Sequence, residues 1–450
     1  MQIFLVYLKN ILYFCSQIMK KTVFLFLFGL ISCSIWAKND SIHYELAYRI
    51  NALGGMMVKD DKVDPWIDRP MLGGTFAVEF LPTGRWKSLQ QWNNTSVGVG
   101  VTYINLGNDK MLGNTVALHG HLNTPFVTLP HFVFGLRPTV GLAFCDKRYS
   151  NTYQSDKYAK YSSFEGANQS IGSVVNAFLG LQLYMDFPVR DGFDITLAFG
   201  WHHISNGSII HPNGGYNMLN GELGMRYTPG LSKARVAVGT AYQRPKTDVP
   251  HHLYDGVSKK WDVEIFATGG LKQNYYKDNM NGMQFFGAAS LGVAAHWQPV
   301  SIFKFGLGVD AFYDGYYACV NDEFKTEDSK HVTYFGKTYL KESKVENCFR
   351  VGISLQPEFT IGKLTAGIHI GFYVWDPIKN LEPYKDAAKG LDRGIFYSYD
   401  FTKASNYQDG WLYTRFILNY LCTKHLFVQI GLKTHGVRAE FIDAGLGVRI

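Results

Sequence analysis

Hydrophobic and polar residues alternate with a period of two along several stretches of this chain. In FDITLAFGWHHIS, residues 193–205, the odd positions are bulky and apolar up to Trp201, whereas the even positions are small or polar. A β-strand directs successive side chains to opposite faces, so this stretch predicts a strand with one apolar face. The same alternation recurs in residues 177–187, 363–374 and 441–450.

Short turns and long loops separate these predicted strands. The connectors PVRDG, QPVS and CTK are short, whereas Asp146–Ser170, Tyr316–Glu346 and Asp376–Asp409 are long and polar. Alternating segments of about ten residues, rich in aromatics, are typical of a transmembrane β-barrel whose apolar face meets lipid. In a soluble sandwich or barrel the same face would form the core. The unequal connectors favour an all-β outer-membrane barrel with its short turns on the periplasmic side.

An internal repeat divides the chain into two halves. The pattern of residues 176–227, strand, short turn, strand near a histidine and final strand, returns in residues 411–450. About eight strands fit Ile42–Tyr227 and about eight fit Trp261–Ile450. Either one barrel of about sixteen strands or two tandem eight-stranded barrels would satisfy this count. We favour the single barrel, because added hairpins create no new sheet edge, although the long connector argues for two.

Composition supports a membrane location and excludes a nucleic-acid partner. Hydrophobic residues make up 46% of the chain, aromatic residues 15% and charged residues only 18%. After the N-terminus no apolar run reaches the ~18 residues of a membrane-spanning helix. The net charge of +7 comes from scattered Lys and Arg, without the basic patch that nucleic-acid binding requires. A mildly basic chain remains compatible with an anionic lipid surface.

The N-terminus carries a targeting signal. From Met19 the sequence reads two lysines, an apolar stretch and a small residue, Ala37, which is the pattern of a secretory signal peptide. We therefore expect residues 1–37 to be a signal peptide with an upstream extension before Met19. The box LISC, ending at Cys33, is the alternative, a lipoprotein cleavage site. Both interpretations place the mature protein outside the cytoplasm.

The stretch WHHISNGSIIHPNGGYN, residues 201–217, combines polar groups on the predicted lipid face. His203 and Ser205 continue the odd, apolar face of the strand, at the end that leads into an outer loop. Asn217 begins the same face of the next strand. Residues i and i+2 are neighbours on one strand face, so His203 can serve as a base for the Ser205 hydroxyl. His202 is expected to point inward, and His211 lies in the loop.

This stretch resembles the catalytic motif of the PagL-type lipid A 3-O-deacylases of Gram-negative outer membranes. The shared pattern is His-x-Ser-Asn-small followed by Pro-Asn-x-Gly, and the resemblance extends over about Ile42–Tyr227. It implies an eight-stranded barrel with its site on the outer wall. It also implies that Ser205 is the nucleophile, His203 the general base and Asn206 a contributor to the oxyanion site.

The chain departs from the motif at its third catalytic position. The family has a glutamate shortly after Pro-Asn-x-Gly, and Asn217 occupies that position here. An asparagine carbonyl can still accept the imidazole N–H and hold its tautomer, but it supplies no charge, so a slower enzyme is expected. Glu222 is predicted to lie on the opposite face and is no substitute. In the second half His435 falls on the inner face and no His-x-Ser follows, which indicates a structural repeat.

Together these features predict a serine hydrolase that removes an ester-linked acyl chain from lipid A, with no metal and no cofactor. The expected partners are lipid A or another acylated lipid and the outer membrane, with no nucleic acid. The alternative is a non-enzymatic barrel, a porin or a structural or adhesive protein whose motif has decayed. The expected domains are a signal peptide at 1–37, a PagL-like barrel repeat carrying the site at 38–230, a connector at 231–259 and a second, non-catalytic barrel repeat at 260–450.

Overall fold

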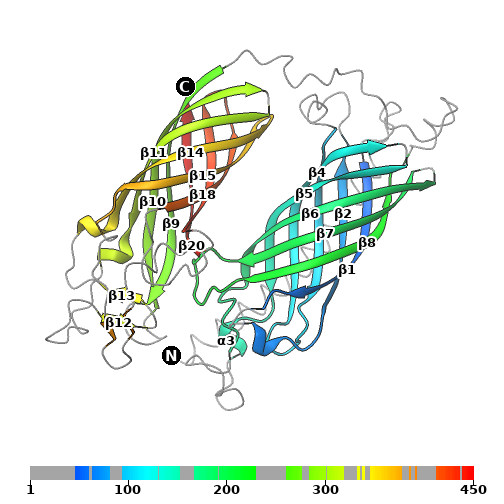
Figure 1. Ribbon diagram of the computed structural model, residues 1–450, viewed down its shortest axis with the longest axis horizontal. Coiled ribbons are helices and arrows are strands. Elements are labelled where there is room, and N and C mark those ends of the chain that lie inside the picture. The colour runs from blue at the N-terminus through cyan, green and yellow to red at the C-terminus, as the bar shows by residue number, and fades with distance from the viewer. Residues whose placement is uncertain are drawn as a thin grey trace, which may run out of the picture. The chain divides into compact units, whose positions relative to one another are not determined.

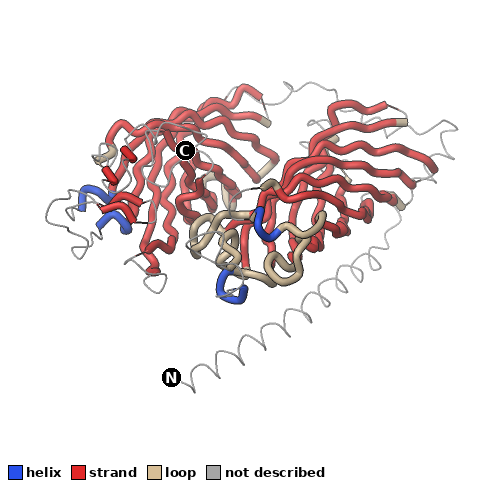
Figure 2. The backbone as a smooth tube through the Cα atoms, turned by 60° about the horizontal axis from the view of Figure 1, so that its bottom comes forward, coloured by secondary structure: helices blue, strands red, loops and turns tan. Residues whose placement is uncertain are grey.

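The computed structural model describes most of the chain from residue 46 onward. The described residues are 46–59, 63–81, 94–129, 131–152, 167–190, 192–229, 260–275, 283–300, 302–318, 332–334, 337–339, 345–377, 385–386, 391–392, 412–435 and 438–450. The expected signal peptide and the expected connector at 231–259 lie outside these residues. Figure 2 shows that strands dominate the fold.

The first half forms a closed antiparallel barrel in which each strand pairs with the next along the chain (Figure 1). Its strands are β1 (Leu46–Met57), β2 (Met71–Phe80), β3 (Ser96–Asn105), β4 (Asn114–Leu129), β5 (Phe132–Cys145), β6 (Val175–Arg190), β7 (Phe193–Ser205) and β8 (Tyr216–Tyr227). The pairs Tyr48↔Tyr227 to Met57↔Met218 join β1 to β8 and close the sheet. Short helices η1 (Asp64–Trp66) and α3 (Tyr149–Thr152) lie in its loops.

The second half forms a closed barrel of its own. Its strands are β9 (Lys260–Tyr275), β10 (Met283–Val300), β11 (Phe303–Asp314), β14 (Phe349–Ile361), β15 (Leu364–Trp375), β18 (Leu412–Leu421), β19 (Leu426–His435) and β20 (Arg438–Arg449). Pairing from Ala444↔Gly269 to Arg449↔Glu264 closes this sheet between β20 and β9. Its loops contain η3 (Gly315–Ala318), η5 (Val345–Cys348), the hairpin of β12 (Val332–Tyr334) and β13 (Lys337–Tyr339), and the hairpin of β16 (Lys385–Asp386) and β17 (Leu391–Asp392).

The prediction of an all-β outer-membrane barrel fold is confirmed, but the preference for one sixteen-stranded barrel was wrong. The structure has the alternative arrangement, two tandem eight-stranded barrels. The preference rested on avoiding unpaired sheet edges. Since each half closes on itself, neither barrel has an edge, and the edge criterion does not separate the two arrangements.

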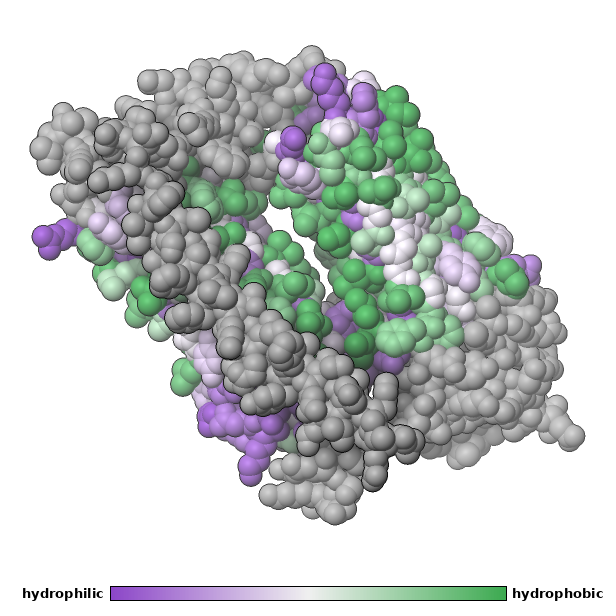
Figure 3. Space-filling view, turned by 180° about the vertical axis from the view of Figure 1, so that it is seen from behind, coloured by the Kyte–Doolittle hydropathy of each residue, from purple (hydrophilic) through white to green (hydrophobic). Residues whose placement is uncertain are grey.

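The alternating patterns place apolar side chains on the outer walls, as predicted. On β7 the odd residue Phe199 is 60% exposed, and the even residue Thr196 is fully buried. On β8 Leu223 is 58% exposed, whereas Asn220 is buried. Hydrophobic residues cover much of the walls visible in Figure 3. Among the described residues, no helix combines the length and the apolar character needed to cross a bilayer.

The interior of the first barrel is packed in layers. We call the end with loops 58–70, 106–113, 146–174 and 206–215 the loop end, and the opposite end the turn end. Buried apolar side chains fill the loop end, namely Leu53, Met57, Val63, Trp66, Met71, Ile104, Leu106, Met111, Leu112, Ala117, Ala143, Cys145, Ile171, Phe178, Ile204, Tyr216 and Met218. This cluster joins strand residues to loop residues such as Trp66, Leu112 and Ile171.

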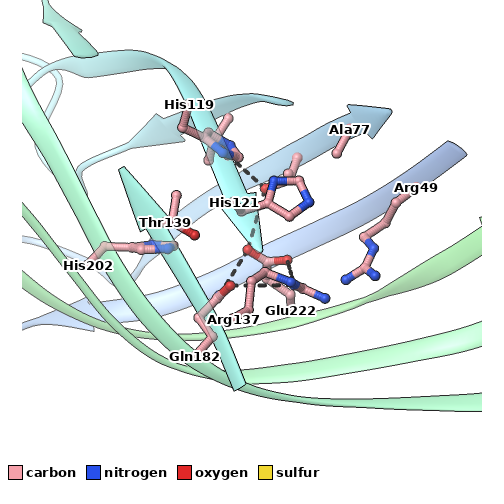
Figure 4. A pocket seen from close by; sticks show the side chains of 11 residues that line it. Arg49, Ala77, His119, His121, Arg137, Thr139, Gln182, His202 and Glu222 are labelled. Carbon is pink, nitrogen blue, oxygen red and sulfur yellow. Dashed lines mark hydrogen bonds and ion pairs between the residues drawn. The ribbon is translucent and has the colours of Figure 1, made fainter. Parts of the chain in front are cut away.

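Below the apolar cluster lies a polar layer centred on Glu222 (Figure 4). Asn51 donates to Glu222 Oε2 over 2.7 Å, and Gln182 donates to Oε1 over 3.1 Å. His119 and His121 lie in the same layer. Because Glu222 faces the interior and is held by these donors, it is separated by the barrel wall from the outer face of β7.

Ion pairs fill the turn end of the same interior. Arg49 contacts Glu79 at 2.6 Å, and Arg226 Nε lies 3.1 Å from the same carboxylate. Arg226 also lies within 3.4 Å of Asp186 and Asp194. Buried charges are tolerated when they are paired in this way. Hydrogen-bonded polar residues and paired charges therefore fill the interior of the first barrel below the apolar cluster.

Candidate functional site

Three polar side chains meet on the outer wall at the loop end of the first barrel. His203 Nε2 lies 2.9 Å from Ser205 Oγ, and His203 Nδ1 lies 2.9 Å from Asn217 Oδ1. His203 and Ser205 are alternate residues of β7, and Asn217 is the residue of β8 paired with His203. Strand register alone thus brings the three groups into contact, at the positions predicted from alternation.

The two hydrogen bonds of His203 determine which ring nitrogen carries the proton. Asn217 Oδ1 can only accept, so His203 Nδ1 must be the protonated nitrogen. His203 Nε2 then has a free lone pair directed at the Ser205 hydroxyl, which donates to it. A hydroxyl, an imidazole and an acceptor arranged in this way can act together as nucleophile, base and orienting group.

The three residues are largely shielded from solvent and have apolar neighbours on the outer wall. Ser205 is only 7% exposed. Trp201 stacks on the His203 ring, with centroids 5.5 Å apart and an angle of 18° between the ring planes. On β6 the residues paired with Ser205 and His203 are Ala177 and Leu179. A hydrocarbon chain approaching along the outer wall would therefore meet apolar side chains on the β6 side of the serine.

Asn206 organises the loop that follows β7. Its Nδ2 group donates to Ser173 Oγ over 2.8 Å and to the Ile210 carbonyl over 2.7 Å. Its backbone N–H donates to Asn213 Oδ1 over 3.0 Å. Both hydrogens of the Asn206 amide are thus engaged within the protein. Donation to a substrate oxyanion, the role that the family resemblance implied, would require one of these bonds to break.

Gly215 lies directly against His203 and Ser205. A Cβ atom on Gly215 would lie 2.9 Å from His203 Cε1 and 3.4 Å from Ser205 Cβ. The backbone φ of this residue is +76°, a conformation that favours glycine. The return of the loop to β8 therefore forms one wall of the site, and its position sets the space around the imidazole.

The other residues considered from the sequence lie away from this site. His202 is buried inside the barrel, where its Nδ1 lies 3.0 Å from Asn220 Nδ2. Glu222 also faces the interior. In the second barrel His435 is buried, with Nε2 2.9 Å from Tyr373 Oη and Nδ1 3.3 Å from Glu440. It has the inward orientation that the sequence predicted.

One group of potential metal ligands occurs among the described residues, in the interior of the second barrel. Oxygen and nitrogen atoms of Asp262, Glu264 and His296 lie within 4.8 Å of one another. Lys304 Nζ contacts Glu264 at 2.6 Å and Asp262 at 3.5 Å, and Arg449 contacts Glu264 at 2.8 Å. These two side-chain cations already neutralise the carboxylates that a metal ion would need, and the group lies far along the chain from Ser205.

Sequence reasoning missed the residues that support the site from outside β7 and β8. The segment 167–173, which precedes β6, contacts the 206–215 loop through Ser170 and Ser173. The alternation predicts Trp201 only as an apolar residue of the outer wall. Trp201 and His203 are two residues apart on the same strand face, and this spacing could have predicted that their rings are in contact. The contacts of Ser170 and Ser173 have no local signal, because the partners are more than thirty residues apart.

Two family models match the chain. Residues 74–226 match the model described as lipid A 3-O-deacylase (PagL). Residues 261–387 and 395–450 match the model described as acyloxyacyl hydrolase, C-terminal domain. The first model thus includes His203, Ser205, Asn206 and Asn217. No curated protein matches the sequence significantly.

Several solved barrel structures are weakly similar to the chain. The outer membrane enzyme PagL shows 13% identity, with 40% of this chain and 98% of that chain covered and a TM-score of 0.24. Neisserial surface protein A shows 13% identity, with 41% of this chain and 97% of that chain covered and a TM-score of 0.24. A Rh. blastica porin mutant shows 9% identity, with 90% of this chain and 99% of that chain covered and a TM-score of 0.15. No conclusion about function follows from similarities this low.

Proposed function

Because this chain belongs to the PagL family, combining its lipid A 3-O-deacylase domain with its acyloxyacyl hydrolase C-terminal domain, we propose that it is an outer-membrane esterase acting on lipid A. The proposed reaction removes an ester-linked acyl chain, with Ser205 as the nucleophile. The observation that carries this proposal is the hydrogen-bonded series Ser205 Oγ, His203 Nε2, His203 Nδ1 and Asn217 Oδ1, with both links at 2.9 Å.

The reaction proceeds in two stages. In the first stage Ser205 Oγ attacks the acyl carbonyl carbon while His203 Nε2 takes the hydroxyl proton. The ester C–O bond then breaks, the departing sugar oxygen receives that proton from His203, and an acyl-serine remains. In the second stage His203 takes a proton from water, and the hydroxide attacks the acyl carbonyl carbon of the acyl-serine. The bond to Ser205 Oγ then breaks, His203 returns the proton to Oγ, and the fatty acid leaves. No metal or cofactor takes part in either stage.

Asn217 acts as a positioning group in this scheme. By accepting from Nδ1, it holds the tautomer in which Nε2 can remove the serine proton. It cannot stabilise the imidazolium with a negative charge, as the glutamate of the family motif would. The enzyme is therefore expected to bind its substrate normally and to turn over slowly.

We assign Asn206 to the shape of the loop. Its amide hydrogens bond Ser173 Oγ and the Ile210 carbonyl, so the residue stabilises the turn immediately after the nucleophile. The oxyanion role that the family resemblance implied would require one of these two bonds to break. The assignment follows from hydrogen-bond accounting, because an amide Nδ2 group has only two hydrogens to donate.

The domain organisation follows from the same proposal. Residues 38–230 would form the catalytic unit after removal of a signal peptide at 1–37, and residues 260–450 would form a non-catalytic barrel. In the second barrel β19 places Val428 and Ile430 on the outer wall, 41% and 55% exposed, with no serine or histidine among them. Its buried His435 faces the interior, so this wall offers no counterpart of the Ser205 site.

Mass spectrometry of lipid A tests the proposal in membranes. Outer membranes of Gram-negative cells that produce the wild-type protein should contain lipid A lighter by one acyl chain. Cells that produce Ser205→Ala should retain the full set of acyl chains. Ser150→Ala is a matched control, because Ser150 is an exposed serine of the short helix α3 whose hydroxyl accepts only from Arg148 in the described contacts. Lipid A that stays intact with the wild-type protein would favour the alternative, a non-enzymatic barrel.

A further inference from the structure

We call residues 206–215, which connect β7 to β8, the site loop. The loop that precedes β6 contacts the site loop at three successive points. Ser173 Oγ accepts from the Asn206 amide over 2.8 Å, next to the nucleophile. Gly172 lies against the backbone of His211 and Pro212, in the middle of the site loop. The Ser170 carbonyl accepts from the Gly215 N–H over 2.8 Å, where the loop returns to β8. We call the segment Ser170–Ser173 the clamp.

The clamp is itself fixed to the barrel. The Ser173 hydroxyl donates to Asn176 Oδ1 over 2.8 Å, and Asn176 is a buried residue of β6. Ile171 is fully buried in the apolar cluster at the loop end. Just before the clamp, Asn168 Nδ2 donates to Tyr216 Oη and to the Met111 carbonyl, and Asn168 Oδ1 accepts from the Ser170 N–H. These contacts with the barrel wall and with the packed interior therefore fix the position of the clamp.

We propose that Gly172 and Ser173 are positioning residues of the esterase site. This inference rests on the proposed function, and it assigns to a second loop the task of holding the first. Gly215 lies against His203 and Ser205, so a shift of the site loop changes the space around the imidazole. Asn206 directly follows the nucleophile, so release of its amide frees the backbone beside Ser205. The clamp thereby controls the alignment of serine and base without touching the substrate.

Gly172 is required because the site loop approaches it closely. A Cβ on this residue would lie 2.7 Å from the His211 carbonyl oxygen and 2.8 Å from the Pro212 carbonyl oxygen, whereas ordinary contact begins at 3.4 Å. These neighbours are backbone atoms, so a larger residue must displace the loop itself. Since misplacement of reacting groups by about 1 Å can cost about a hundredfold in rate, Gly172→Ala should lower kcat roughly ten- to hundredfold.

Ser173 is required for its hydroxyl. It accepts from Asn206 while it donates to Asn176, so one atom links the loop to the wall of the barrel. Ser173→Ala removes both bonds and leaves the Asn206 amide with one buried hydrogen unsatisfied. Ser173→Thr keeps a hydroxyl on the same carbon. We expect Ser173→Ala to lower kcat by about tenfold and Ser173→Thr to restore it.

The experiment compares full-length variants in detergent micelles with lipid A as substrate. Gly172→Ala, Ser173→Ala and Ser173→Thr are measured beside two controls, Ser150→Ala and Gly54→Ala. Gly54 is suitable because the only atom near an added Cβ is a side-chain carbon at 3.9 Å. For each variant we measure kcat, KM, heat-modifiable migration and amide hydrogen exchange of residues 206–215.

The expected result is a lower kcat at unchanged KM, with faster exchange of residues 206–215 and normal heat-modifiable migration, for Gly172→Ala and Ser173→Ala only. Wild-type kcat and exchange in both variants would overturn the inference. It would equally be overturned if activity fell only in proportion to loss of the folded band, because the residues would then be merely structural. If the wild-type protein releases no fatty acid, the proposed function fails, and exchange of the site loop still decides whether the clamp holds it.

Discussion

At the scale of single residues, the most informative position is Asn217. Its side-chain oxygen holds the His203 N–H at 2.9 Å, in the place where the family motif has a glutamate. An acceptor oxygen is thus present at this position, but it carries no negative charge. The effect of that loss on the rate can be separated from the effect of geometry by substitutions of matched length.

The prediction for Asn217 concerns turnover. Asn217→Glu should raise kcat because a carboxylate stabilises the imidazolium that forms in the reaction. Asn217→Gln, with the same length and no charge, should not raise it. Asn217→Ala should lower kcat by about tenfold or more, because the tautomer is no longer held. Steady-state assays of fatty acid release provide the measurement, and an equal gain from Gln and Glu would contradict the electrostatic explanation.

At the scale of elements, β7 is the most important strand because it contains both His203 and Ser205. Alternation along Phe193–Ser205 correctly predicts which side chains face outward, because lipid on one side and a packed interior on the other demand opposite polarity. It also predicts that His203 and Ser205 share a face. It cannot predict the 206–215 loop, whose contacts with Ser170–Ser173 join residues without a shared periodicity.

A charged substitution on the outer face of β7 tests its exposure to lipid. Phe199 lies mid-strand and is 60% exposed. Phe199→Arg should destabilise the folded barrel by roughly 2–4 kcal/mol, the usual cost of arginine near the bilayer midplane. Val189, 61% exposed near the turn end of β6, is the matched control. Val189→Arg should cost at most about 1 kcal/mol.

The measurement is reversible urea unfolding of both variants in lipid vesicles. Equal costs for Phe199→Arg and Val189→Arg would show that depth in the bilayer does not govern the effect. The outer-wall assignment of β7 would then be wrong.

At the scale of the whole molecule, the central feature is that each half closes on itself. The alternating pattern predicted about eight strands in each half, and the structure has eight strands in each barrel. The pairing of the first strand with the last in each barrel, β1 with β8 and β9 with β20, was not predictable. The alternation along a strand identifies its two faces but not the strand with which it pairs. The choice between one barrel and two depends on those pairings.

Closure predicts that the first barrel folds without the second. Residues 38–230 should refold alone in detergent with heat-modifiable migration, because pairing of β1 with β8 leaves no open edge. Since His203, Ser205 and Asn217 all belong to β7 and β8, the fragment should also release fatty acid. A fragment that aggregates while the full chain refolds under the same conditions would contradict independent closure.

The initial rate of fatty acid release from purified lipid A, by purified wild-type protein and by Ser205→Ala, tests the central claim most directly. Loss of the hydroxyl removes the nucleophile, while the variant should migrate as a folded barrel because Ser205 lies outside the packed interior. We predict that Ser205→Ala lowers the rate at least about a thousandfold and that no acyl group is trapped on the variant. A wild-type rate in folded Ser205→Ala would show that Ser205 is not the nucleophile.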